Sequence, residues 1–180
     1  MLGIAGPPGA GKSTLAALLA AHLSATVVPM DGFHLSNAEL RAHDRLAAKG
    51  ALDTFDGAAF VSLLQRIRAG EAVRAPAFDR QHDCTVPAAI PVPAHVLVIV
   101  EGNYLLHDQA PWDRIAPLLD QVWYVDTEHR VERLIARHVR SGRVDVEARR
   151  RATTGSDAVN ARLVALGRHR ADLYLGEGWR

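Results

Sequence analysis

Residues 6–13 read Gly6-Pro7-Pro8-Gly9-Ala10-Gly11-Lys12-Ser13, and this stretch decides the fold of the chain. It matches the phosphate-binding pattern Gly-x-x-x-x-Gly-Lys-Ser/Thr. The glycines let the backbone curl so that its N–H groups point inward at an anion. Lys12 adds a mobile positive charge, and the hydroxyl of Ser13 is a suitable ligand for Mg²⁺. The stretch therefore predicts a site for phosphate groups.

The segments on either side of this loop have the order that a phosphate site requires. Residues 2–5 are apolar and predict a buried strand. Residues 12–23 carry apolar side chains at positions 15, 18, 19 and 23, a spacing that predicts a helix. Because strand, glycine loop and helix follow one another, a bound phosphate would lie at the amino terminus of the helix.

Length and composition point to a single domain with a substantial core. The chain has 180 residues, of which 48% are hydrophobic, so disorder is not expected. Its net charge of +1 gives no general attraction to nucleic acid or to a membrane, and neither is expected as a partner. Cys84 is the only cysteine and no targeting segment is expected before the first strand, so the predicted location is the cytoplasm. A homodimer is expected only on the base rate of symmetric oligomers.

The rest of the chain predicts strands that alternate with helices. The predicted strands are residues 26–30, 95–100, 122–125 and 171–175, and the predicted helices are 37–49, 57–69, 128–140 and 146–168, the last with a break near 155. Residues 73–94 are rich in proline and predict a loop with a short hairpin. Such alternation predicts an α/β protein with a mostly parallel five-stranded sheet flanked by helices.

In sheets of this class, ligands bind beyond the carboxyl ends of the strands. Besides the glycine loop, this rule selects Asp31, Glu101 and Asp126, because each follows a predicted strand. The stretch 32–94 is too long for a simple connection and is expected to form a lid or an acceptor site.

Two of these carboxylates suit phosphoryl transfer. Asp31 can accept the proton of an attacking hydroxyl or hold Mg²⁺ through water, and the sequence leaves both roles open. Glu101 has the position of a Walker-B-type acid near Mg²⁺, although many nucleotide hydrolases use Asp there. His34 is a candidate contact to an acceptor, and Tyr104 either lines the acceptor cavity or packs in the core.

Further motifs extend over nearly the whole chain. They are Asp31-Gly32-Phe33-His34, Thr54-Phe55-Asp56, Phe78-Asp79-Arg80, Val100-Glu101-Gly102 and Arg133-Leu134-Ile135-Ala136-Arg137-His138. Together with the loop at 6–13, they resemble the phosphoribulokinase, uridine kinase and pantothenate kinase family of P-loop kinases. The bacterial nucleoside- or fructose-kinase-like members are the most similar, through residues 31–37 and 101–106.

This resemblance implies a three-layer P-loop NTPase fold and ATP-dependent phosphorylation of a small-molecule hydroxyl, with Mg²⁺. It implies one domain over residues 1–180, with an acceptor-site insertion at 32–94 and a lid at about 128–145. The acceptor would be a sugar, a nucleoside or a pantothenate-like compound. The chain is shorter than typical pantothenate kinases, and residues 52–56 lack the His-Pro lead usual in uridine kinases, so neither acceptor is favoured.

The resemblance also implies roles for individual residues. The nucleotide phosphates would contact Gly6, Gly9, Ala10, Gly11, Lys12, Ser13 and Thr14. Ser13 and Glu101 would lie at the metal, and Asp31 would be the general base for the acceptor. Arg133 and Arg137 would belong to the lid, and Asp79 and Arg80 to the acceptor region.

Three other functions compete with this hypothesis. A nucleotide-driven switch is less consistent with the sequence, since it has neither an Asn-Lys-x-Asp guanine motif nor a Leu-Ser-Gly-Gly-Gln signature. A degenerate nucleotide-binding module is disfavoured by the intact Lys12, Ser13, Asp31 and Glu101. A nucleotide kinase would need further arginines on the acceptor side.

The roles of two other features are less clear from the sequence. His138 is either structural or faces the nucleotide, and the sequence leaves both open. The run Arg149-Arg150-Arg151 predicts an exposed basic face.

Overall fold

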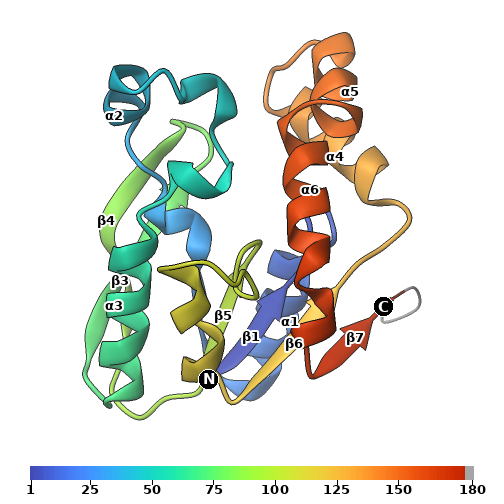
Figure 1. Ribbon diagram of the computed structural model, residues 1–180. Coiled ribbons are helices and arrows are strands. Elements are labelled where there is room, and N and C mark those ends of the chain that lie inside the picture. The colour runs from blue at the N-terminus through green and yellow to red at the C-terminus, as the bar shows by residue number, and fades with distance from the viewer. Residues whose placement is uncertain (177–180) are drawn as a thin grey trace.

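Five parallel strands form the central sheet of the molecule, in the order β2-β5-β1-β6-β7 (Figure 1). They are β1 (Leu2–Ala5), β2 (Thr26–Pro29), β5 (Val98–Gly102), β6 (Gln121–Val125) and β7 (Leu173–Leu175). The computed structural model describes residues 1–176. β1 is therefore the central strand, and the loop that follows it leaves the sheet at its middle.

Helices cover both faces of the sheet, which gives the three layers expected from the sequence. The helices of the described residues are α1 (Lys12–Leu23), α2 (Asn37–Ala42), α3 (Gly57–Arg68), α4 (Arg130–Arg140), α5 (Asp145–Thr153) and α6 (Ser156–Leu166), of which α2, α4 and α5 lie beyond the sheet (Figure 1). On one face, Leu15 and Ala16 of α1 pack on Ile4 and Ile99. On the other, α3 and the segment 104–119 form the larger core.

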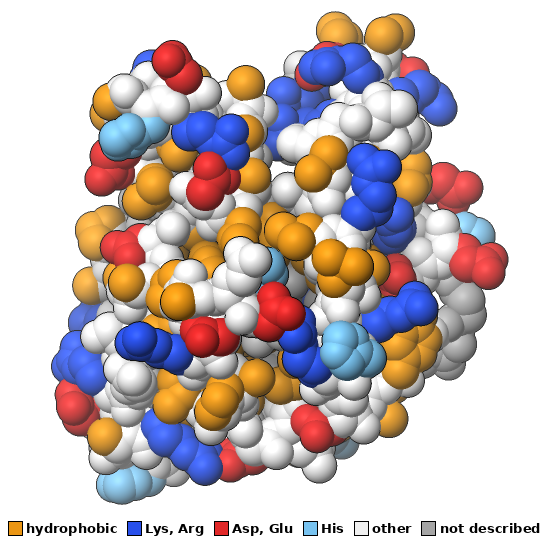
Figure 2. Space-filling view, in the orientation of Figure 1, with side chains coloured by type: hydrophobic (Ala, Val, Ile, Leu, Met, Phe, Trp, Pro, Cys, Tyr) orange, Lys and Arg blue, Asp and Glu red, His pale blue; other side chains and the backbone are white. Residues whose placement is uncertain are grey.

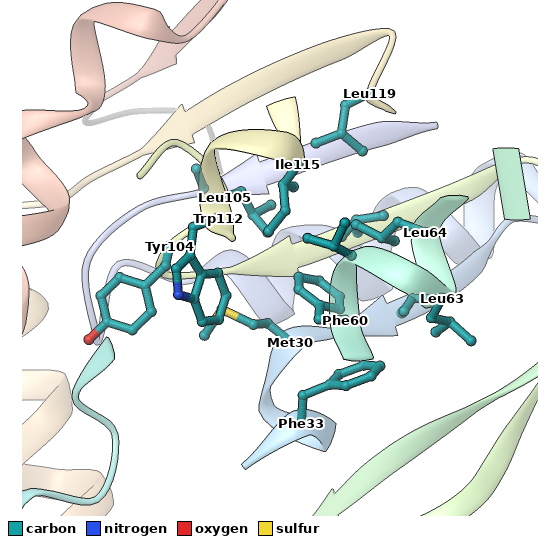
Figure 3. Packing of buried hydrophobic residues seen from close by; sticks show 14 of the residues in the cluster. Met30, Phe33, Phe60, Leu63, Leu64, Tyr104, Leu105, Trp112, Ile115 and Leu119 are labelled. Atoms are coloured by element: carbon teal, nitrogen blue, oxygen red, sulfur yellow. The ribbon is translucent and has the colours of Figure 1, made fainter. Parts of the chain in front are cut away.

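The larger core is rich in aromatic rings (Figure 3). Phe60 of α3 lies against Phe33, with ring centroids 4.8 Å apart. Tyr104 and Trp112 meet edge to face at 5.7 Å, in the segment that follows β5. Because neighbouring residues of a strand point to opposite faces, Ile4 belongs to the α1 side while Ala5 belongs to this one.

Two arms rise from the carboxyl edge of the sheet (Figure 1). The insertion arm, residues 32–94, contains α2, α3 and an antiparallel hairpin of β3 (Val73–Asp79) and β4 (Cys84–Val92). The helical arm, residues 128–166, contains α4, α5 and α6. The hairpin packs so closely on the turn after β2 that a Cβ at Gly32 would collide with the carbonyl oxygen of Pro76.

Several boundaries differ from those expected. The helix expected over 37–49 ends at Ala42, because Asp44 takes a left-handed conformation with φ 53° and short turns follow. The hairpin in 73–94 is longer than expected, since proline is tolerated in a two-stranded ribbon with free edges. The strand expected over 95–100 is found at Val98–Gly102, and Glu101 lies within it. The break near 155 is confirmed, between α5 and α6.

Within residues 1–176, no helix combines the length and the apolar character needed to cross a membrane.

The core beneath α3 gives a test of the fold. Leu64 is fully buried there, whereas Leu166, at the end of α6, is 70% exposed. Leu64→Ala should lower the free energy of unfolding by about 2–5 kcal/mol, because the cavity cannot fully close. Leu166→Ala, which removes the same atoms from another helix, should stay within about 0.5 kcal/mol of the parent. Urea denaturation of both variants measures the difference, and equal losses would contradict this packing.

Candidate functional site

A cleft of about 650 Å³ opens between the two arms, above the carboxyl edge of the sheet (Figure 2). The glycine loop contributes Pro8, Gly9, Lys12 and Ser13 to its floor. The insertion arm and the helical arm form the two walls. The charged side chains that line it are Lys12, Asp31, Arg41, Lys49, Arg80, Asp83, Glu101, Arg137, Arg143, Arg151 and Asp157. Cations outnumber carboxylates in this set, so the cleft suits an anionic ligand.

The loop at the floor is curled as the glycine pattern predicts. Gly6, Gly9 and Gly11 have φ values of 149°, 82° and 101°, which side chains rarely adopt. A Cβ at Gly6 would collide with the carbonyl oxygen of Val125, and one at Gly9 with that of Arg130. Glycine is therefore required at these two positions both for the conformation and for close packing against β6 and α4.

Lys12 carries its charge into the protein interior. The residue is only 8% exposed, and its ammonium group donates to the carbonyl oxygen of Pro7 at 3.0 Å and to Oδ1 of Asn103 at 2.7 Å. Burial lowers the pKa of Lys12 to about 8, against the opposing attraction of Glu101 and Asp31. The group is thus a partly compensated cation, and a phosphate would stabilise its charged form.

Ser13 and Glu101 lie next to each other beside Lys12. The Ser13 hydroxyl donates to Oε1 of Glu101 at 3.0 Å. Burial raises the pKa of Glu101, and the nearby Asp31 raises it further, while Lys12 and the Ser13 hydrogen bond lower it. A hydroxyl and a carboxylate are hard oxygen donors, which Mg²⁺ prefers.

The described residues contain no group of three or more His, Cys, Asp and Glu side chains that could hold a metal ion. Mg²⁺ usually takes only one or two protein ligands and completes its shell with phosphate and water. The pair formed by Ser13 and Glu101 therefore fits Mg²⁺ that arrives with a nucleotide.

Asp31 lies on the insertion side of the same cleft. Its carboxylate Oδ2 is 2.6 Å from Nη2 of Arg80, which comes from the tip of the β3–β4 hairpin. His34 donates through Nδ1 to the backbone carbonyl of Asp31 at 2.7 Å. Its ring lies against those of Phe55 and Phe78, with centroids 4.0 and 4.6 Å away and ring planes tilted by 40° and 37°. Burial lowers the pKa of His34, which favours the neutral imidazole.

The helical arm contributes a further arginine to the cleft. Arg137 lines it, and burial lowers the pKa of that guanidinium, with a smaller effect of the nearby Arg80. Arg133, one turn earlier on α4, is not among the lining residues, and its Nη1 is buried with no hydrogen-bond partner in the described part of the chain. His138 lines the cleft, and its Nε2 bonds to Asp157 at 2.6 Å, which gives it a structural role.

Besides Arg133, several candidates from the sequence do not line the cleft, namely Gly6, Ala10, Gly11, Thr14, Asp79, Tyr104 and Asp126. Asp79 accepts hydrogen bonds from the backbone of Gln81 and His82, and so shapes the turn that carries Arg80. Tyr104 is buried in the core, where its hydroxyl donates to the carbonyl of Gly50 at 2.8 Å, so the packing alternative is the one found. Asp126 accepts from the backbone N–H of Thr127 at the end of β6.

Comparison with known proteins identifies the family. Residues 1–155 match the phosphoribulokinase / uridine kinase family. The chain belongs to this family. It is 37% identical over 158 residues to a Schizosaccharomyces pombe protein named "Putative uridine kinase C227.14", a match that covers 79% of this chain and 67% of the relative. It is 35% identical over 164 residues to the ATP-dependent kinase-like protein notR′ of Aspergillus versicolor, covering 84% and 95%.

A solved structure also supports membership of this family. It is described as a "putative fructose transport system kinase" from Silicibacter sp. TM1040, and it superposes with a TM-score of 0.87 at 38% identity. The match covers 96% of this chain and 87% of that one. The chain is therefore a P-loop kinase of the phosphoribulokinase / uridine kinase family, and membership implies that it uses ATP.

Sequence reasoning missed several residues of this kinase's cleft. Asn103, a partner of Lys12, follows Glu101 by two positions at the same strand end, which was the available signal. Arg151 was expected on an exposed face but is turned inward. It lies three residues after the buried Ala148 on α5, and that spacing was a usable clue. Arg41 and Lys49 line the cleft because of the way in which the insertion arm folds, and the sequence alone does not predict that fold.

The lowered pKa of Lys12 predicts a pH-dependent affinity for nucleotide. As pH rises through about 8, the free protein loses the proton of Lys12, so an anion should bind progressively more weakly. Affinity for a non-hydrolysable MgATP analogue should fall about tenfold from about pH 7 to about pH 9, measured by calorimetry. Lys12→Arg, which keeps its charge, should flatten the profile, and a flat profile in the parent would contradict the assignment.

Proposed function

We propose that this kinase transfers the γ-phosphoryl group of ATP to a hydroxyl of a small molecule. The observation that supports this most directly is the position of Asp31. Its carboxylate faces the cleft that holds Lys12, and it influences the pKa values of both Lys12 and Glu101. A carboxylate so near the phosphate site would repel a nucleotide that arrives without a metal ion. It can, however, align an attacking hydroxyl and accept its proton.

The other residues of the site have complementary roles in this proposal. Lys12 and the curled loop neutralise the β- and γ-phosphates, and Thr14 lies nearest the α-phosphate. Ser13 and Glu101 hold Mg²⁺, which would neutralise phosphate charge when bound. Arg137 would contact the nucleotide as part of a lid over residues 128–145, with Arg133 one turn earlier on α4. Together these groups would bind and orient the phosphates and exclude water.

The acceptor side is the wall formed by the insertion arm. His34 and the rings of Phe55 and Phe78 form a cluster of aromatic rings there, which together give an apolar surface. Such a surface suits the face of a sugar or nucleoside, with Arg80 beside it for polar contacts. Two of the similar proteins carry such a compound in their names, the "Putative uridine kinase C227.14" and the "putative fructose transport system kinase". A pantothenate-like acceptor is the remaining alternative.

A second candidate is an acceptor that carries a phosphate, as in a nucleotide kinase. The observation in its favour is that Arg41, Lys49 and Arg80 all reach the cleft from the insertion arm. Lys49 is already paired with Asp83, at 3.1 Å, and Arg80 with Asp31. An acceptor screen that includes sugars, nucleosides and their monophosphates, followed by mass spectrometry of the products, separates the two candidates.

Substitution of Lys12 and Asp31 tests the catalytic roles. Lys12→Ala should abolish ATP-dependent turnover, because the phosphate charge is left uncompensated. Asp31→Asn should lower kcat about 100-fold or more, because the proton acceptor is lost, with ATP binding retained, because Lys12 and the glycine loop remain. Turnover is followed by ADP release with the acceptor from the screen, and ATP binding by calorimetry. Asp113→Asn, at an exposed position outside the cleft, is the control. Full activity of Asp31→Asn would refute the role of Asp31 as the base.

The metal site is tested by the Mg²⁺ requirement. Ser13→Ala and Glu101→Gln should each raise the Mg²⁺ concentration for half-maximal activity about tenfold or more, since the first removes the hydroxyl ligand and the second removes the negative charge of the carboxylate ligand. Asp31→Asn should leave that concentration unchanged if Asp31 acts as the base. If it rises there instead, Asp31 holds Mg²⁺ through water, which is the alternative left open by the sequence.

A further inference from the structure

We propose that Arg151 and Asp157 are positioning residues that fasten the helical arm to the insertion arm. The contact is named the clasp here; it consists of His138, Arg151, Asp157 and Asn160, with the backbone of residues 49–50. The inference deepens the proposed function, because it links the nucleotide side of the cleft to the acceptor side.

Asp157 is the centre of the clasp on the helical arm. Its side chain is only 9% exposed, and its Oδ2 lies 2.6 Å from Nε2 of His138 and 3.7 Å from Nε of Arg151. The three residues come from α6, α4 and α5, so one buried carboxylate joins all three helices of the arm. A buried carboxylate of this kind is stable only while its partners stay in place.

Arg151 and Asn160 carry the contact across to the insertion arm. Nη2 of Arg151 donates to the carbonyl oxygen of Lys49 at 2.8 Å, and Nδ2 of Asn160 donates to that of Gly50 at 2.9 Å. The hydroxyl of Tyr104 donates to the same Gly50 oxygen at 2.8 Å. Gly50 has φ 100°, a conformation that turns successive carbonyls toward these donors. The carbonyl groups of Lys49 and Gly50 therefore both accept hydrogen bonds from the helical arm, and that of Gly50 also accepts one from the core.

At each end, the clasp is connected to residues that line the cleft. Beyond the fixed backbone of Lys49, its ammonium group donates to Oδ1 of Asn37 at 2.7 Å and lies 4.9 Å from the ring centre of Phe78. On the other arm, His138 directly follows Arg137, which lines the cleft. A continuous set of contacts therefore runs from the lid arginine to the aromatic acceptor wall.

This connection fixes the distance between the two walls. Transfer of a phosphoryl group requires the acceptor oxygen in line with the γ-phosphate, and small misplacements lower the rate strongly. Loosening the clasp should therefore weaken acceptor use and admit water to the phosphate, while the glycine loop continues to bind ATP. Arg151 and Asp157 would act through the position of Lys49 and Arg137 rather than on the reacting atoms.

The test compares Arg151→Gln with Arg150→Gln. Arg150 is the adjacent residue of α5, but its side chain is exposed and pairs with Glu147. In Arg151→Gln, the KM for the acceptor should rise about tenfold and the ratio of ADP to phosphorylated product should increase, while the Kd for the MgATP analogue changes less than about twofold. Arg150→Gln should match the parent. Equal behaviour of the two variants, or equal losses of ATP and acceptor affinity, would overturn the proposal.

A second measurement does not depend on kinase activity. Amide hydrogen exchange in residues 45–54 and 130–140 should speed up in Arg151→Gln and in Asp157→Asn, but not in Arg150→Gln. Faster exchange confined to α5 and α6 would show that the clasp does not reach the insertion arm, and would overturn the inference. If the parent phosphorylates no acceptor, the proposed function fails, but the hydrogen-exchange rates still test whether the clasp joins the two arms. If Asp157→Asn does not fold, the exchange rates of Arg151→Gln alone provide this test.

Discussion

The positive charge of Lys12, held almost completely out of water, is the constraint on which the rest of the site depends. Burial disfavours the charged form of a lysine, and the lowered pKa reflects that penalty. The protein compensates with the carbonyl of Pro7, the amide oxygen of Asn103 and the nearby carboxylates of Glu101 and Asp31. A triphosphate would add the missing negative charge. The site is thus electrostatically prepared for its ligand rather than neutralised without it.

The order of the strands makes this arrangement possible. β5 follows β2 by some seventy residues in the chain, yet it pairs between β1 and β2 in the sheet. Glu101 and Asn103 therefore lie directly beside the glycine loop, with Asp31 on the next strand end. Gly102 permits this packing, since a Cβ there would lie 2.6 Å from the Cβ of Met30. The residues that compensate the charge of Lys12 are distant in the chain, but the sheet brings them together at one edge.

The two arms convert this edge into an enclosed cleft. The insertion arm supplies Arg80, His34 and the aromatic wall, and the helical arm supplies Arg137. The contacts of Arg151 and Asn160 with residues 49–50 join the arms away from the sheet. The solved structure that is 38% identical superposes on 96% of this chain with a TM-score of 0.87, so it shares the overall arrangement. Under the proposed function, the acceptor would meet a wall built from a long insertion, which is a part of the chain where members of such a family can diverge.

The sequence by itself determined the glycine loop, the helix that follows it, the parallel α/β fold and the strand-end positions of Asp31 and Glu101. These follow from short-range rules, namely glycine spacing and apolar periodicity, which act within a few residues. Only the tertiary structure decided that Arg151 turns inward while Arg149 and Arg150 stay outside, that Tyr104 packs in the core, and that Asn103 and Lys49 join the site. Those outcomes depend on contacts between segments far apart in the chain, and no local pattern encodes which distant carbonyl or carboxylate a side chain will meet.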